Sequence, residues 1–100
     1  MSDQERYGVA IIGLGTMGRR YIEVFDNHDG FELVGGFDVG EQARTAAAAD
    51  FGMRVTASAE ELITDPNVHV VYIATPPLYH EVYVDQVQAA GKAIFCEKPL

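Results

Sequence analysis

The sequence predicts an α/β domain of the doubly wound class, with a parallel sheet covered by helices on both faces. Three observations support this fold class. Short apolar runs typical of buried strands alternate with helical patterns along the chain. These runs are nearly continuous in apolar residues, as in parallel sheets whose two faces are both covered. The first run leads through a glycine-rich turn directly into a helix.

The first half of the chain predicts two strand–helix units. The first unit combines a buried strand at residues 7–13 with a helix at 16–27, whose apolar residues recur on one side. A turn of Asn, His, Asp and Gly follows. The second unit combines a strand at 31–38 with an alanine-rich helix at 41–51. Gly52 fits the left-handed position that often closes a helix.

The second half of the chain continues the alternation. Residues 53–56 are predicted to form a short third strand, and the SAEE sequence from Ser58 has the capping-box pattern of a helix start. This helix is expected to end before Pro66. The remaining predicted elements are a fourth strand, a helix and a fifth strand, at residues 68–74, 78–90 and 93–97. We therefore expect five parallel strands joined by right-handed crossovers.

Length and composition limit the class of protein. One hundred residues, 48% of them apolar, predict a single folded domain at residues 1–100. The chain ends three residues after the predicted fifth strand, so we expect an incomplete dinucleotide-type domain whose parent carries a second domain. The net charge of −8, with only seven Lys and Arg, argues against nucleic acid or an anionic membrane as partner. No signal-peptide pattern or membrane span is visible, so a cytoplasmic location is expected.

The glycine-rich turn has the pattern G-x-G-x-x-G. Gly13 permits a tight turn, Gly15 lets a ligand approach the backbone, and Gly18 lets the helix pack closely on the strand. The N–H groups near Thr16 and Met17 are expected to point at the ligand. Because a helix N-terminus carries unpaired donors and partial positive charge, the ligand expected there is a diphosphate. A structural turn without a ligand is the alternative.

Asp38 strengthens the dinucleotide interpretation. It ends the second predicted strand twenty residues after Gly18, where a carboxylate can accept hydrogen bonds from the adenosine ribose. A carboxylate there would repel a 2′-phosphate, so NAD is expected rather than NADP. A helix cap or a solvated loop acid is the alternative for Asp38. Arg44 is expected to be a solvated helix charge, and Arg19 to assist the phosphates or to lie on the surface.

Two further segments follow predicted strands at the same edge of the sheet. Thr75, Pro76 and Pro77 follow the fourth strand, and the sequence Glu97-Lys98-Pro99 follows the fifth. Ligands of open parallel sheets bind outside the carboxyl ends of the strands, so both segments are expected near the redox half of the cofactor. No metal site is expected.

The segments ATPPLYH and GKAIFCEKPL, with the intervening helix, resemble the N-terminal domain of the Gfo/Idh/MocA family, which includes glucose-fructose oxidoreductase and inositol dehydrogenase. The resemblance runs from about Val9 to the end of the chain. It implies a nicotinamide-dependent dehydrogenase acting on a sugar or polyol, with a homo-oligomeric parent protein. The family pattern also carries a histidine three residues after the third glycine, where this chain has Tyr21.

The resemblance also implies roles for single residues. Lys98 would be catalytic, lying beside the nicotinamide and taking or orienting the proton that leaves the substrate hydroxyl. Glu97 would set the charge and position of that lysine. Pro76 and Pro77 would shape the wall under the nicotinamide, and His80 would border the site. The substrate domain of the family lies beyond Leu100, so this chain alone is expected to be inactive.

Two other functions remain open at this stage. A dinucleotide-sensing regulator shares the fold, although a sensor has no need of a proton-transfer group such as Lys98. A methyltransferase that uses S-adenosylmethionine also has a glycine loop after its first strand and an acid after its second. That alternative gives no role to the Glu97-Lys98-Pro99 segment.

Overall fold

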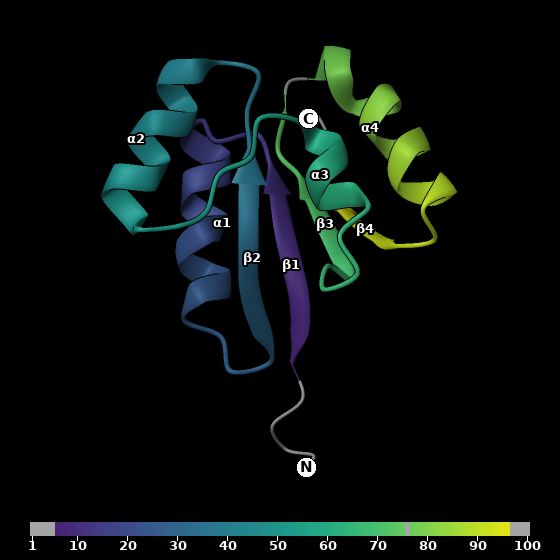
Figure 1. The fold of residues 1–100 in the computed structure, drawn as a ribbon, viewed down its shortest axis with the longest axis horizontal. Coiled ribbons are helices and arrows are strands. Elements are labelled where there is room, and N and C mark those ends of the chain that lie inside the picture. The colour runs from purple at the N-terminus through teal and green to yellow at the C-terminus, as the bar shows by residue number, and fades with distance from the viewer. Residues whose placement is uncertain (1–5, 76, 97–100) are drawn as a thin grey trace.

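The computed structural model describes residues 6–75 and 77–96 of the chain. Within them, strands and helices alternate as the sequence predicts, except that no strand separates the second helix from the third (Figure 1). The elements, in chain order, are β1 (Tyr7–Ile12), α1 (Thr16–Asp26), β2 (Phe31–Phe37), α2 (Glu41–Phe51), α3 (Ala59–Ile63), β3 (Val70–Ile73), α4 (Pro77–Ala89) and β4 (Ala93–Cys96). No helix of this described part is long and apolar enough to cross a membrane.

The strands form one parallel sheet in the order β2-β1-β3-β4. Ile12 pairs with Phe37 on one side and with Ile73 on the other, and Ile73 pairs with Cys96. The four strands therefore end level with one another at one edge of the sheet. From β1 the chain passes through α1 to β2 on one side, and after α2 and α3 it returns to β3 on the other side of β1. The boundary between β1 and β3 is thus the point where the strand order reverses, which is where doubly wound sheets bind ligands.

The predicted strand at residues 53–56 is wrong as a strand. Only Val55 joins the sheet, through a single parallel bridge to Gly36. The two hydrogen bonds of this bridge run from Gly36 N to Arg54 O and from Thr56 N to Gly36 O, each 3.0 Å. Pairing cannot extend further because Gly52, at φ +63°, closes α2 just before it, and the Thr56 hydroxyl turns the chain by donating to Ser58 O. The described part therefore has four strands instead of five.

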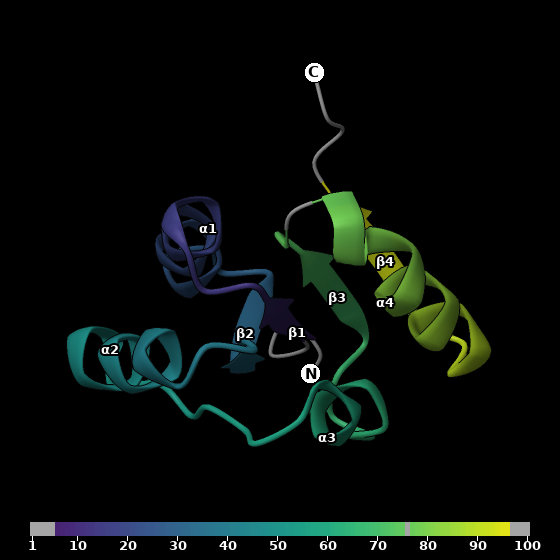
Figure 2. The ribbon, with the colours of Figure 1, turned by 90° about the horizontal axis from the view of Figure 1, so that it is seen from above.

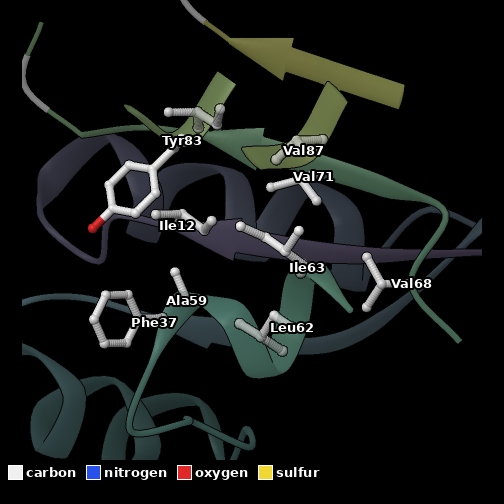
Figure 3. Packing of buried hydrophobic residues seen from close by; sticks show 11 residues of the cluster. Ile12, Phe37, Ala59, Leu62, Ile63, Val68, Val71, Tyr83 and Val87 are labelled. Atoms are coloured by element: carbon white, nitrogen blue, oxygen red, sulfur yellow. The ribbon is translucent and has the colours of Figure 1, made fainter. Parts of the chain in front are cut away.

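Helices cover both faces of the sheet, which confirms the doubly wound class. Along β1, Val9 and Ile11 face a cluster that includes residues of α1 and α2, while Ala10 and Ile12 face a cluster built with α3 and α4. Figure 2 shows α1 and α3 on opposite sides of the sheet. The α3–α4 cluster is drawn in Figure 3. Every β1 residue from Val9 to Ile12 is fully buried, so β1 is the centre of the core.

Two predicted helix ends are confirmed in detail. The Ser58 side chain accepts a hydrogen bond from Glu61 N at 3.3 Å, as expected of a capping box, and its hydroxyl donates to Glu61 Oε2 at 3.3 Å, where a full capping box uses the backbone N–H of the N-cap. Gly52 closes α2 in the left-handed conformation, with its N–H donating to Ala48 O. Local sequence signals therefore determine where α2 ends and α3 begins.

Lys92 fastens the loop before β3 to the turn before β4. Its ammonium donates to the carbonyl oxygens of Asp65 and Val68, at 2.7 and 2.6 Å. On the outer side of the same loop, the exposed Arg54 donates to the Asp65 carboxylate at 3.1 Å. The backbone N–H of Asn67 and the guanidinium of Arg54 both lower the pKa of Asp65.

Lys92→Met is expected to lower the free energy of unfolding by about 1–3 kcal/mol. Methionine keeps the apolar stem but leaves two carbonyl groups without their charged donor. Urea denaturation followed by circular dichroism measures the change. Arg54→Met is the matched control, because it removes an exposed cation that donates to the same loop, and little change is expected there. Equal effects of the two substitutions would contradict the role assigned to Lys92.

Candidate functional site

A cavity of about 480 Å³ lies at the carboxyl ends of β1 and β3, at the point where the strand order reverses. The glycine turn, the end of β2, the end of β3 and α4 all contribute to its wall. Six predicted site residues line it, namely Gly13, Gly15, Thr16, Met17, Asp38 and Thr75. Residues from four separate segments therefore converge on one space, of the size that small-molecule sites usually have.

Gly13 brings the glycine turn against the end of β3. Its φ is +106°, and a Cβ there would lie 2.7 Å from the carbonyl carbon of Ala74 and 2.9 Å from Thr75 N. Its N–H donates to Phe37 O at 2.7 Å, so the same residue is also tied to the end of β2. A side chain at this position would be strained in φ and would force the two strand ends apart.

Gly15 and Gly18 differ in what a side chain would meet. A Cβ on Gly18 would lie 1.8 Å from Gly13 O, so α1 packs directly on the turn. A Cβ on Gly15 would meet no atom within 4 Å, and Gly15 lines the cavity. Gly15 is also the N-cap of α1 and provides no side-chain hydrogen bond to it. The first N–H groups of α1, at Thr16 and Met17, thus lack an intrahelical partner and lie at the cavity.

The Asp38 carboxylate connects two turns. Its Oδ2 accepts from Leu14 N at 2.8 Å, and its Oδ1 accepts from Gly40 N, next to the start of α2, at 2.7 Å. Asp38 is therefore partly structural, as its alternative interpretation held, but it is not a freely solvated acid. An ionised carboxylate offers about four acceptor positions. Two of these remain for a ligand in the cavity that Asp38 lines.

Arg44 is not the solvated charge that the sequence suggested. Its Nη1 donates to Asp38 O at 2.8 Å and to Val39 O at 3.4 Å, and its guanidinium carbon lies 5.9 Å from the centroid of the Phe37 ring. One side chain of α2 thereby holds the backbone that carries Asp38. Arg19 forms an ion pair with Asp50 and lies over Phe51, so it connects α1 with α2.

Thr75 contributes a buried hydroxyl at the end of β3. Its Oγ1 has no hydrogen-bond partner among the described residues, and the residue lines the cavity. Such an unpaired polar atom costs free energy unless a ligand or water completes its hydrogen bonds. The open space at Gly15 and this hydroxyl both suit a polar ligand such as a dinucleotide.

The other predicted site residues are not placed at this cavity. His80 lies half-buried in the first turn of α4 and does not line it. Pro76, Glu97 and Lys98 lie outside the described residues, as does the side chain of Pro77. Across residues 6–75 and 77–96, no group of three or more His, Cys, Asp or Glu could hold a metal ion.

Tyr79 and Tyr83 of α4 also line the cavity, and sequence reasoning did not assign them to the site. The signal in the sequence was their spacing of four residues, which puts both side chains on one face of α4, the helix that follows β3. Tyr79 is exposed, whereas Tyr83 is buried. Burial first, and then the charge of Asp38, raises the pKa of the Tyr83 phenol.

Known proteins resemble this chain in sequence and in fold. Residues 7–100 match an oxidoreductase family described by its NAD-binding Rossmann fold. An inositol 2-dehydrogenase of Rhodococcus erythropolis is 33% identical over 103 residues, covering 100% of this chain and 30% of that protein.

Two solved structures are also similar. The enzyme GenD2 from gentamicin A biosynthesis, in complex with NAD, has a TM-score of 0.88 and 41% identity over 96% of this chain and 28% of its own. Biliverdin reductase from Synechocystis, in complex with biliverdin and NADP⁺, has a TM-score of 0.87 and 33% identity over 93% of this chain and 29% of its own. The chain thus spans less than one third of the length of these relatives.

Substituting Gly18 and Gly15 by alanine is expected to separate folding from binding. Gly18→Ala forces α1 away from the turn and should lower the free energy of unfolding by about 1–3 kcal/mol. Gly15→Ala has room for its methyl group and should cost less than about 1 kcal/mol, the difference between glycine and alanine as N-caps. The same methyl group would obstruct the cavity and weaken NADH binding about tenfold or more.

Urea denaturation and calorimetric titration with NADH measure the two effects. Unimpaired NADH binding by a folded Gly15→Ala variant would contradict the role of this position. A Gly18→Ala variant as stable as the wild-type chain would contradict the close packing of α1 on the turn.

Proposed function

Because the chain belongs to the Gfo/Idh/MocA oxidoreductase family, as its NAD-binding Rossmann domain, we propose that it holds NAD for hydride transfer with a sugar, an inositol or a related polyhydroxy substrate. The observation that supports this best is the convergence of Gly15, Asp38 and Thr75 on one cavity at the reversal point of the sheet. The inositol 2-dehydrogenase relative supports the substrate class.

The chain's own groups are assigned to the two halves of the adenosine diphosphate. The first N–H groups of α1 would hold the diphosphate, because helix N-termini favour anions and Gly15 leaves the approach open. The free acceptor positions of Asp38 would receive the two ribose hydroxyls. A 2′-phosphate would meet the same carboxylate, which supports NAD over NADP. The guanidinium of Arg44 is engaged with backbone carbonyls instead.

The reacting end is proposed to lie toward β4, on the same edge of the sheet. Bound nicotinamide would supply the hydride acceptor, and the substrate's carbinol carbon would give up a hydride while its hydroxyl gives up a proton. Lys98 follows the last residue of β4 by two positions in the sequence. We assign it to take that proton in its neutral form, with Glu97 orienting it. Pro76, Pro77 and His80 are proposed to border the nicotinamide.

A parent protein with a second, substrate-binding domain is part of this proposal, since the relatives are more than three times as long as the chain. A homo-oligomeric parent and a cytoplasmic location are proposed with it, and gel filtration and cell fractionation test them.

The proposed function is tested with that parent protein, NAD⁺ and a panel of inositols, sugars and other polyols, by following NADH absorbance. Oxidation of at least one polyhydroxy compound is the expected result. Saturable NADH binding without turnover of any of them would favour the sensing regulator. Binding of S-adenosylmethionine in place of NADH would overturn the oxidoreductase assignment.

Asp38→Ala is expected to weaken NADH binding by about tenfold or more, with a smaller loss for NADPH. The substitution removes the acceptors of the ribose hydroxyls and also the charge that opposes a 2′-phosphate. Calorimetric titration of the chain with both cofactors gives the ratio of the two dissociation constants. Asp29→Ala removes an exposed acid far from the cavity lining and serves as the control. An unchanged ratio in Asp38→Ala would remove this residue from the ribose site.

Lys98→Met in the parent protein is expected to lower kcat by about 10²–10⁴-fold, the usual contribution of a positioned acid or base. The dissociation constant of NADH should change far less, because the adenosine half of the site is untouched. Steady-state kinetics and cofactor titration of the same preparation separate the two effects. Turnover close to that of the wild-type protein would end the catalytic assignment.

A further inference from the structure

Tyr83 links the core on the α3–α4 face to the cavity. It is 9% exposed, and its ring packs in the cluster that contains Ile12, Phe37 and Ala59. Figure 3 shows the hydroxyl at the end of the ring that points away from Ile12 and Val87. Tyr83 also lines the cavity together with Gly13 and Asp38. A buried ring therefore holds a polar group at the wall of the site.

The hydrogen bonds at the cavity wall are made by other groups, namely the Asp38 carboxylate with Leu14 N and Gly40 N, and Gly13 N with Phe37 O. Asp38 is the acid that lines the cavity, and each of its carboxylate oxygens accepts one hydrogen bond from a backbone N–H. A tyrosine whose ring is buried usually places its hydroxyl where it can meet a hydrogen-bond partner. Because Tyr83 lines the cavity, a ligand there can be that partner.

The ionisation of Tyr83 fixes its role as a donor. Burial and the Asp38 carboxylate both raise its pKa above the ordinary value of 10.0 for tyrosine. The phenol therefore stays protonated at neutral pH and offers an O–H to an acceptor. Ribose hydroxyls and phosphate oxygens are acceptors, and both occur between the glycine turn and Asp38 if a dinucleotide lies as proposed.

We propose that Tyr83 is a cofactor-binding residue, whose phenol donates a hydrogen bond to an oxygen of the adenosine diphosphate half of the dinucleotide. The inference rests on the proposed function, since it takes NAD as the occupant of the cavity. It assigns α4 a contact to the adenosine half of the cofactor. The rigid packing of the ring in the core means that the donor is already in place before the ligand arrives.

Tyr83→Phe tests the proposal because it removes only the hydroxyl and keeps the packed ring. The variant chain is expected to bind NADH about 3- to 10-fold more weakly, as the loss of one net hydrogen bond predicts. ADP-ribose, which lacks the nicotinamide, should lose affinity by the same factor. The urea midpoint should not fall. Tyr7→Phe, at an exposed position at the start of β1, is the matched control and should bind both ligands like the wild-type chain.

The outcomes separate this inference from the proposed function. If the wild-type chain binds NADH and Tyr83→Phe binds both ligands equally well, Tyr83 is not a cofactor contact although the function stands. If only NADH binding weakens and ADP-ribose binding does not, the contact is not to the adenosine diphosphate half and the proposal is overturned. If the folded wild-type chain binds neither ligand, the proposed function fails and this inference fails with it.

Discussion

The close approach of the glycine turn to the end of β3 is the contact on which the site depends. β1 is the strand from which the chain spreads in both directions across the sheet, so its carboxyl end must turn sharply within a crowded space. Gly13 meets this requirement because it adopts a positive φ and has no Cβ, which would otherwise clash with Ala74. The start of α1 and the wall of the cavity are then positioned by backbone atoms, which do not depend on side-chain rotamers.

A second set of contacts holds the turn after β2. The Asp38 carboxylate accepts from the N–H groups of Leu14 and Gly40, while Arg44 donates to the carbonyls of Asp38 and Val39. The carboxylate and the guanidinium thus bind the two ends of the Val39–Gly40 peptide, its N–H and its carbonyl. Because the ring of Phe37 packs in the core below, the carboxylate is held from the glycine turn, from α2 and from its own strand.

The order of the elements and the glycine turn could be predicted because the signals for them are local. Apolar periodicity marks β1 and α1, and the missing side chains at Gly13 and Gly18 need no tertiary information to be noticed. The failed strand at residues 53–56 is different. Its apolar residues were visible, but whether they pair depends on how much chain remains between the end of α2 and the turn into α3.

The two features of the site that the sequence did not reveal, the engagement of Arg44 and the position of Tyr83, depend on tertiary packing. An arginine within a helix carries the same sequence signal whether it faces water or reaches back to a turn. A tyrosine at core spacing predicts burial, yet only the packing of α4 against the sheet, chiefly against β3 and β4, brings Tyr83 to the cavity wall.

The double use of Asp38 has a consequence for the evolution and engineering of the domain. A substitution of Asp38 removes the acceptor of two backbone N–H groups. A substitution that changes ligand preference therefore also weakens the hydrogen bonds that hold this turn. A replacement that keeps the turn must supply new acceptors for the N–H groups of Leu14 and Gly40. It must also leave a place for the Arg44 guanidinium, which donates to the carbonyls of residues 38 and 39. The unit that can be exchanged without disorder is therefore the whole segment from residue 37 to residue 44, transplanted together.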